Sequence, residues 1–342
     1  MGALLAVLIC SYLEPPLVEL IAATPGVEVF NAPELLPQPR YACDHTGRRR
    51  DLDQAGLRRW GELLATAEVC FDFDWDQPAR LPERAPKLRW IQATSAGIGG
   101  FMDRTGLSAS FITVTTAAGV HAVPLSEWVL TGVLHFVKDI PELQARQRAH
   151  RWERTAVGAL AGRRAVVVGL GHVGRRIGEV LAALGVEVWG AGRAGSSYDR
   201  PTLARVGSTT ELAGMLPGCD VLVLCSPLTT ETEGIIGRAE LALLPEHAIL
   251  VNIGRGHLVD EDAMIEALQA GRLGGAVLDV ARVEPLPQDS PLWDLDNVLI
   301  CPHSASTFAT ENSALVELFL DNLQRYRTGA PMRNLYQTDR GY

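Results

Sequence analysis

The stretch at residues 165–177, AVVVGLGHVGRRI, constrains the fold of this chain more than any other. Its four leading apolar residues, mostly β-branched, predict a buried parallel strand. Gly169, Gly171 and Gly174 follow and open a pattern with helical spacing. In such a loop the first glycine permits a tight turn, the second a close approach of backbone to a pyrophosphate, and the third close packing of helix on strand. The stretch predicts a dinucleotide-binding βαβ unit, although glycine loops also end ordinary strands.

The residues after the next expected strand, 186–189, indicate which dinucleotide this unit takes. They read Gly190-Ala191-Gly192-Arg193, with no acid where an Asp or Glu would bond the adenosine ribose of NAD. Arg193 can instead hold a ribose 2′-phosphate, because a guanidinium forks onto phosphate oxygens. We therefore expect NADP, with NADPH preferred, or else NAD. The alternative is a solvated arginine in a glycine-rich loop.

Charge and composition exclude several classes of protein. A net charge of −9 and a pI of about 5.4 argue against a nucleic-acid-binding face. The apolar run at 3–10 is too short to span a bilayer and is expected to be a strand. Lys87 and Lys138 are the chain's lysines, and neither lies in a P-loop. The 6 cysteines show no CxxC spacing, which is typical of reduced thiols. We expect a cytoplasmic protein with no nucleic-acid or membrane partner and no metal site.

Strand and helix patterns alternate along the chain, which is typical of parallel sheets. The expected strands are 4–9, 27–30, 69–73, 88–92 and 112–115, then six more at 165–168, 186–189, 221–225, 248–251, 276–280 and 298–301. The expected helices include 17–23, 57–67, 124–137, 209–216, 260–270 and 313–327.

We predict an α/β fold with two parallel-sheet domains. A Rossmann NAD(P)-binding domain at 122–309 is expected to be inserted in a flavodoxin-like, substrate-binding (catalytic) domain at 1–121 and 310–342. The arginine-rich segment 141–162 is an alternative place for the crossing between the domains. The segment 31–53, rich in proline and arginine, is expected to be irregular.

Three charged or titratable residues follow strands of the second domain: Arg255, Glu284 and His303. Ligands of such sheets bind beyond the carboxyl ends of the strands, so these side chains can meet at one site. An arginine can grip a carboxylate, a histidine can exchange a proton with a carbonyl oxygen, and a glutamate can fix the histidine's tautomer. Such groups suit the reduction of a 2-oxo acid. Each also has a structural interpretation, as a turn arginine, a loop-capping glutamate or a buried histidine.

These motifs together resemble the D-isomer-specific 2-hydroxyacid dehydrogenases. The resemblance covers the second domain nearly end to end and is looser in the first. It is carried by VNIGRGHLVDE at 251–261, GGAVLDV at 274–280, EPLP at 284–287, PLW at 291–293, Asn297-Val298 and Pro302-His303, and in the first domain by Ser95-Ala96-Gly97-Ile98, Gly119-Val120-His121 and Ser126-Glu127.

The resemblance implies a role for each matching residue. Arg255 would bind the substrate carboxylate and carbonyl, His303 would be the general acid/base, and Glu284 would support the histidine. Backbone N–H groups around Ala96 and Gly97 would complete the carboxylate site.

The resemblance also implies a cofactor site. Asp279 would face the nicotinamide carboxamide. His172 stands where the family commonly has an arginine, so contact with the pyrophosphate would rely on backbone. The expected cofactor residues are Gly169, Gly171, His172, Val173, Gly174, Arg193, Pro227, Thr232, Ile253, Asp279 and Ser304.

We therefore expect an NAD(P)-dependent D-2-hydroxyacid dehydrogenase that works as a reductase of glyoxylate- or hydroxypyruvate-like 2-oxo acids. The resemblance suggests a homodimer. A branched or aromatic 2-oxo acid stays open as substrate, because the match is loosest in the domain that sets pocket size. The alternative from another class is a dinucleotide-sensing, non-catalytic binding protein or corepressor on the same fold.

Overall fold

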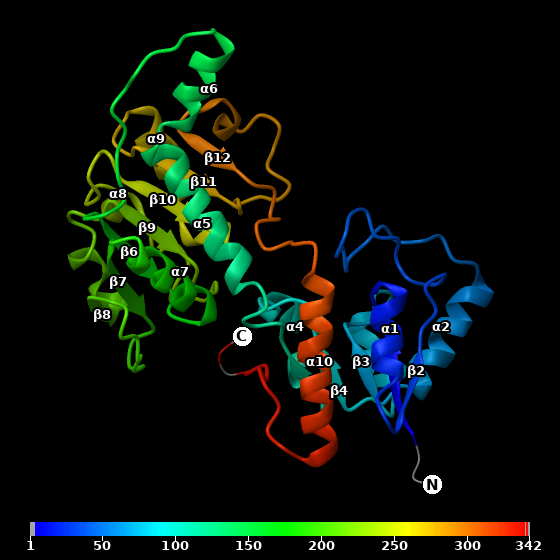
Figure 1. Cartoon of the computed structure of the whole chain (residues 1–342). Coiled ribbons are helices and arrows are strands. Elements are labelled where there is room, and N and C mark those ends of the chain that lie inside the picture. Colours follow the sequence, from blue (N-terminus) through cyan, green and yellow to red (C-terminus); the bar gives the residue numbers. More distant parts are fainter. Residues whose placement is uncertain (1–3, 339, 341–342) are drawn as a thin grey trace. The chain divides into compact units, whose positions relative to one another are not determined.

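The computed structural model describes residues 4–338 and 340 and confirms an α/β fold with two all-parallel sheets. The chain divides into two compact units (Figure 1). The first unit combines residues 1–120 with 307–342, and the second contains residues 121–306. Among the described residues, no helix is both long enough and apolar enough to cross a membrane.

The first unit contains a five-stranded sheet in the order β2-β1-β3-β4-β5. This is the strand order of flavodoxin-like folds, as predicted. The inner strands β3 and β4 are buried throughout, whereas the edge strand β2 carries an exposed Glu28. The strands are β1 (Leu5–Ile9), β2 (Val27–Phe30), β3 (Val69–Phe71), β4 (Trp90–Gln92) and β5 (Thr113–Thr115).

Helices cover both faces of the first sheet. On one face α1 (Pro15–Ala22) and α10 (Glu311–Thr328) lie side by side (Figure 1). Phe319 of α10 stacks on Trp90 of β4 with ring centroids 5.2 Å apart. The other face holds α2 (Gln54–Thr66), α3 (Leu81–Arg84), α4 (Gly99–Thr105) and the 3₁₀ turns η1 (Pro78–Arg80) and η2 (Leu107–Ala109).

The segment 31–53 of the first unit is irregular, as expected, apart from a bridge between Gln38 and Arg48. A buried carboxylate next to it fixes the turn after β3. Asp74 accepts from Trp60 Nε1 at 2.9 Å and from Arg84 Nη1 at 2.6 Å. It also accepts from the backbone of Asp76, which pairs with both Arg49 and Arg84. The network ties this segment to helices α2 and α3.

The second unit contains a seven-stranded sheet in the order β12-β11-β10-β9-β6-β7-β8. The prediction of six strands was wrong by one, because β8 was missed. β8 is an edge strand of sequence RVGS whose Val206 is 40 % exposed, so it lacks the apolar run of a buried strand. The strands are β6 (Arg164–Val168), β7 (Glu187–Gly192), β8 (Arg205–Ser208), β9 (Val221–Leu224), β10 (Ile249–Asn252), β11 (Gly275–Leu278) and β12 (Val298–Ile300).

Side chains alternate between the two faces of this sheet. One face packs against α5 (Ala122–Val137) and α7 (His172–Ala183), and Gly132 leaves no room for a Cβ between α5 and Val277. The expected helix at 209–216 is a 3₁₀ helix, η3. The other face packs against η3 (Thr209–Gly214), α8 (Arg238–Leu241) and α9 (Glu261–Gln269), and the remaining turns are η4 (Gly256–Leu258) and η5 (Pro291–Asp294).

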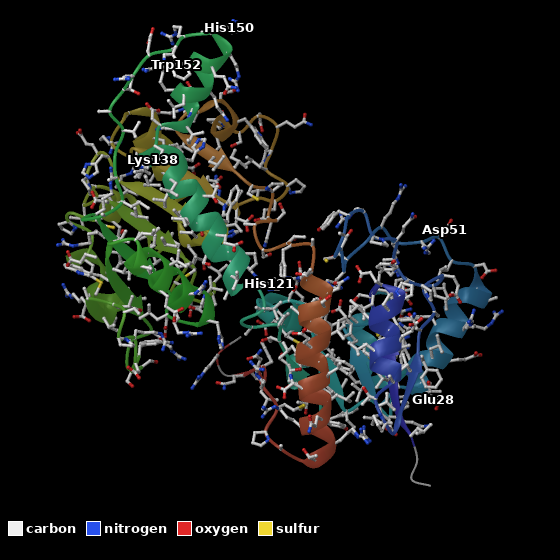
Figure 2. The ribbon with its side chains drawn as sticks, viewed as in Figure 1. Glu28, Asp51, His121, Lys138, His150 and Trp152 are labelled. Atoms are coloured by element: carbon white, nitrogen blue, oxygen red, sulfur yellow. The ribbon has the colours of Figure 1, made fainter. Side chains whose placement is uncertain are left out.

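The segment 141–162 lies inside the second unit, so the alternative that placed the crossing there was wrong. The crossings fall at 120–121 and 306–307. Helix α6 (Ile140–Arg148) starts the segment, and a loop with His150 and Trp152 follows it (Figure 2). Trp152 is 99 % exposed. Lys138 Nζ donates to the carbonyl of Gly158 at 2.8 Å, which returns the loop to the end of α5.

Replacing the buried carboxylate Asp74 with alanine should destabilise the protein by about 3–5 kcal/mol, the usual cost of breaking a buried ion pair. The change leaves the buried Trp60 Nε1 without its acceptor and leaves Arg84, which is mostly buried, paired with Asp76. Urea unfolding followed by circular dichroism measures the loss. The matched control is Asp262→Ala, which breaks an exposed pair with Arg282 and should change the urea midpoint little. Equal midpoints for Asp74→Ala and Asp262→Ala would contradict the importance of this network.

Candidate active site

The order in which strands are added to the second sheet reverses between β6 and β9. From β6 the chain builds β7 and β8 on one side, and then returns to build β9 to β12 on the other. In parallel sheets, ligands bind in the crevice beyond the carboxyl ends of the two strands at such a switch point. Gly169 follows β6 there and Ser226 lies just past β9. The candidate site is therefore this edge of the sheet.

The glycine loop between β6 and α7 has the shape that a pyrophosphate needs. Gly169 has a φ of +103°, which favours glycine, and a Cβ there would lie 2.6 Å from Ser226 N. A Cβ on Gly174 would collide with the carbonyl oxygen of Gly169. Gly171, by contrast, faces open space, so backbone at this point can meet a ligand. His172 and Val173 open helix α7, whose positive dipole end points at the same place. The loop fits the phosphates of a dinucleotide.

At the end of β7, where an acidic side chain would select NAD, the chain has Gly192 with a tyrosine ring packed against it. The Tyr198 ring covers the place where a side chain on Gly192 would be, and its hydroxyl accepts from Arg193 N at 3.0 Å. The Arg193 residue is exposed. Arg200 Nη2 donates to the carbonyl of Leu170 at 2.7 Å and so joins this loop to the glycine loop. The sequence interpretation missed Arg200, because its spacing carries no motif.

The residues expected to line the rest of the cofactor follow β9 and β10. Thr232 is 8 % exposed, and its hydroxyl donates to the carbonyl of Pro227 at 2.7 Å and accepts from Thr229 N at 2.8 Å. This bond closes the loop after β9. Ile253 follows β10 directly and is 7 % exposed. All three expected residues, Pro227, Thr232 and Ile253, thus lie beyond the carboxyl ends of neighbouring strands.

Arg255 lies in a loop that a buried amide shapes. Asn252 is 2 % exposed; its Nδ2 donates to the carbonyl of Arg255 at 2.9 Å and its Oδ1 accepts from Gly254 N at 3.1 Å. Gly256 has no room for a Cβ because the backbone of Ala281 occupies that space. The loop after β10 is therefore pressed against the loop after β11. The sequence interpretation missed Asn252, although a polar residue at the end of an apolar run is a usable signal.

His303 and Glu284 are in contact. His303 Nδ1 lies 2.7 Å from Glu284 Oε2, and the other carboxylate oxygen of Glu284 accepts from Ala281 N at 3.2 Å. The side chains of His303 and Glu284 are 47 % and 38 % exposed, so both remain accessible. Because Glu284 occupies Nδ1, Nε2 is the ring nitrogen that can exchange a proton with a ligand.

Asp279 holds the backbone of the histidine loop. His303 has a φ of +50°, an unusual value for a residue with a side chain. Its N–H donates to the carbonyl of Asp279 at 2.8 Å. Asp279 Oδ1 accepts from the N–H groups of Ser304 and Ala305 at 2.8 and 2.9 Å. A strained backbone held by a buried carboxylate is typical of a functional position.

Arg255 leaves the sheet two strands away from His303, with β11 between β10 and β12. At the usual strand spacing this separates their backbones by roughly 10 Å, a distance that an arginine side chain and a small acid can span. The structure thus brings Glu284 into contact with His303 and places Arg255 at the same edge of the same sheet.

Ala96 and Gly97 belong to the first unit, in the loop between β4 and α4. The loop is anchored at its start, where Thr94 Oγ1 donates to Asp72 Oδ2 at 3.1 Å. The carbonyl of Ser95 accepts from Ala117 N at 3.1 Å. Both contacts fix the backbone at the carboxyl edge of that sheet.

The cysteines near the second unit's ligand edge are protonated. Burial raises the pKa of the Cys225 thiol to about 12. Burial also raises the pKa of Cys301, and hydrogen bonds from Ser304 offset this only in part. All six cysteines are free thiols, as expected. Cys225 and Cys301 are therefore poor sources of a thiolate nucleophile at neutral pH.

Comparison with known proteins identifies a family that matches this chain. The family model described as D-isomer specific 2-hydroxyacid dehydrogenase, NAD binding domain, matches residues 130–305, more than half of the chain. Glyoxylate/hydroxypyruvate reductase A of Klebsiella pneumoniae is 33% identical over 221 residues, which cover 64% of this chain and 69% of that protein.

Solved structures extend the similarity to both units. A D-isomer specific 2-hydroxyacid dehydrogenase from Xanthobacter autotrophicus, in complex with NADPH and MES, has a TM-score of 0.78 and 30% identity over 100% of both chains. An NADPH-dependent glyoxylate/hydroxypyruvate reductase from Sinorhizobium meliloti, in complex with NADP and sulfate, has a TM-score of 0.78 and 26% identity over 99% of this chain and 100% of that one.

The glycine loop, the paired histidine and these similarities define a nicotinamide-dependent oxidoreductase. More narrowly, the chain belongs to the D-isomer-specific 2-hydroxyacid dehydrogenase family.

Replacing Glu284 with glutamine should lower kcat on the order of 10²-fold, the usual effect of misplacing a reacting group slightly. The amide keeps the size of the side chain but has one oxygen to accept from both His303 and Ala281, and it carries no charge. Steady-state turnover of a 2-oxo acid measures the loss. Glu266→Gln is the control, because Glu266 pairs with Arg238 on an exposed surface. An unchanged kcat in Glu284→Gln would show that Glu284 does not contribute to the reaction.

Proposed function

We propose that this protein reduces glyoxylate- or hydroxypyruvate-like 2-oxo acids to D-2-hydroxy acids and prefers NADPH over NADH. The observation that carries the proposal is the 2.7 Å contact between His303 Nδ1 and Glu284 Oε2 at the ligand edge of a nucleotide-binding sheet. The relatives named above as glyoxylate/hydroxypyruvate reductases support this substrate class.

In this proposal each residue has a defined role in the reaction. His303 donates the proton on Nε2 to the substrate's carbonyl oxygen, while Glu284 orients the ring and stabilises the charged imidazolium. Arg255 binds the substrate carboxylate with two N–H bonds and steadies charge that develops on the carbonyl oxygen. Ala96 and Gly97 stay predicted ligands of the carboxylate through their N–H groups.

The cofactor, when bound, supplies the hydride. Gly169, Gly171, His172, Val173 and Gly174 would hold the pyrophosphate at the start of α7. Arg193 would bind the 2′-phosphate. Asp279, whose Oδ1 accepts from Ser304 N, would face the nicotinamide carboxamide. The further predicted lining residues are Pro227, Thr232, Ile253 and Ser304.

Two features support the preference for NADPH. The loop after β7 offers Arg193 where an acid would repel a 2′-phosphate and select NAD. The similar enzymes from Xanthobacter autotrophicus and Sinorhizobium meliloti were crystallised with NADPH and NADP.

A homodimer and a cytoplasmic location stay predictions from the sequence. So does the alternative of a non-catalytic, dinucleotide-sensing protein or corepressor, which turnover of any short 2-oxo acid by the purified protein would exclude.

His303→Ala should lower kcat by roughly 10²- to 10⁴-fold, because that is the span lost with a general acid/base. NADPH consumption with glyoxylate and with hydroxypyruvate measures it. His247→Ala is a matched control, because His247 forms the same kind of pair, 2.7 Å from Asp220, but precedes β10 at the opposite edge of the sheet. Near-wild-type turnover in His303→Ala would remove the histidine from the mechanism.

Arg193→Ala should lower kcat/KM for NADPH by roughly 10- to 100-fold, the worth of a charge-assisted bond to phosphate. The value for NADH should stay the same, because NADH has no 2′-phosphate. Arg238→Ala, on an exposed surface away from the loop, serves as control. A wild-type enzyme that prefers NADH, or equal losses with both cofactors, would contradict the assignment.

A further inference from the structure

Ser226 occupies the centre of the ligand edge of the second sheet. It comes just after β9, which pairs with β6 on one side and with β10 on the other. The residue is 6 % exposed. Neither a motif nor its spacing marked it as a binding residue.

Two glycines hold the backbone of Ser226 close to both neighbouring loops. A Cβ on Gly169 would lie 2.6 Å from Ser226 N, and a Cβ on Gly254 would lie 2.9 Å from Ser226 O. One neighbour is the glycine loop, and the other is the loop that carries Arg255. A dinucleotide that runs from the glycine loop towards Arg255 must therefore pass over Ser226.

The hydroxyl of Ser226 is buried and has no hydrogen-bond partner among the described residues. Other buried hydroxyls of this unit do have partners: Ser126 Oγ donates to the carbonyl of Val123 at 2.7 Å, and Thr232 Oγ1 donates to Pro227. A buried polar group without a partner destabilises a fold, so it needs an explanation. An incoming ligand is one, because a serine hydroxyl turns between staggered positions without any movement of the backbone.

We propose that the Ser226 hydroxyl donates a hydrogen bond to a pyrophosphate oxygen of the bound dinucleotide. The inference rests on the proposed function only in taking a nicotinamide dinucleotide as the ligand. The glycine loop supplies backbone donors from the β6 side, and Ser226 supplies a side-chain donor from the β9 side. The phosphates are thereby held from both strands of the switch point.

Ser226→Ala tests this in the full-length protein, by calorimetric titration with NADPH, NADH and adenosine 2′-monophosphate. Affinity for NADPH and NADH should fall by the same factor, roughly 10-fold, since both carry the pyrophosphate and the lost bond is to a charged group. Affinity for adenosine 2′-monophosphate, which lacks the pyrophosphate, should not change. The thermal midpoint without nucleotide should stay the same or rise, because the alanine removes an unpartnered hydroxyl.

Ser126→Ala is the matched control, since it removes a partnered hydroxyl in the same unit. It should lower the thermal midpoint and leave nucleotide affinity unchanged. Unchanged affinity of Ser226→Ala for both dinucleotides would overturn the inference. So would a weaker affinity for adenosine 2′-monophosphate, or a fall in midpoint like that of Ser126→Ala. Absence of turnover in a wild-type protein that binds NADPH would overturn the proposed function instead, and leave the Ser226 result standing.

Discussion

Backbone crowding at the ends of four neighbouring strands, β6, β9, β10 and β11, is the constraint on which the site depends. The chain passes so closely at Gly169, Gly254 and Gly256 that a Cβ would meet the backbone of the next loop. Loops packed in this way cannot move independently of one another. The sheet therefore holds the glycine loop, Arg255 and the histidine loop in fixed positions along one edge.

Buried polar side chains then fix each loop's shape. Asn252 donates to the carbonyl of Arg255 within its own loop. Asp279 accepts from the N–H of Ser304, the residue after His303. Neither group needs to touch a substrate to matter. Their hydrogen bonds replace the regular ladder that stops where the strands end, so that Arg255 and His303 project from loops whose backbone is held by side chains.

Much of this could be predicted from sequence, because apolar runs and glycine spacing report burial and close approach directly. All five strands of the first sheet and six strands of the second follow such runs, and the contact of Glu284 with His303 follows from the rule that parallel strands end at one edge. β8 escaped prediction because an exposed edge strand needs no apolar pattern. Arg200 and Ser226 escaped because their roles depend on which loop lies opposite them, and that is set by packing between distant segments. The Asn252 side chain bonds within its own loop, and it was missed although a polar residue ends the apolar run there.

Two separate stretches of sequence build the core of the first unit, and this affects the order in which the two units can fold during synthesis. Its sheet face around Trp90 is covered by Phe319 and its neighbours on α10, which the ribosome makes after the whole second unit. The second unit, by contrast, is encoded by one uninterrupted stretch. The nascent chain can therefore complete its nucleotide-binding half while the other half still exposes an aromatic surface to chaperones.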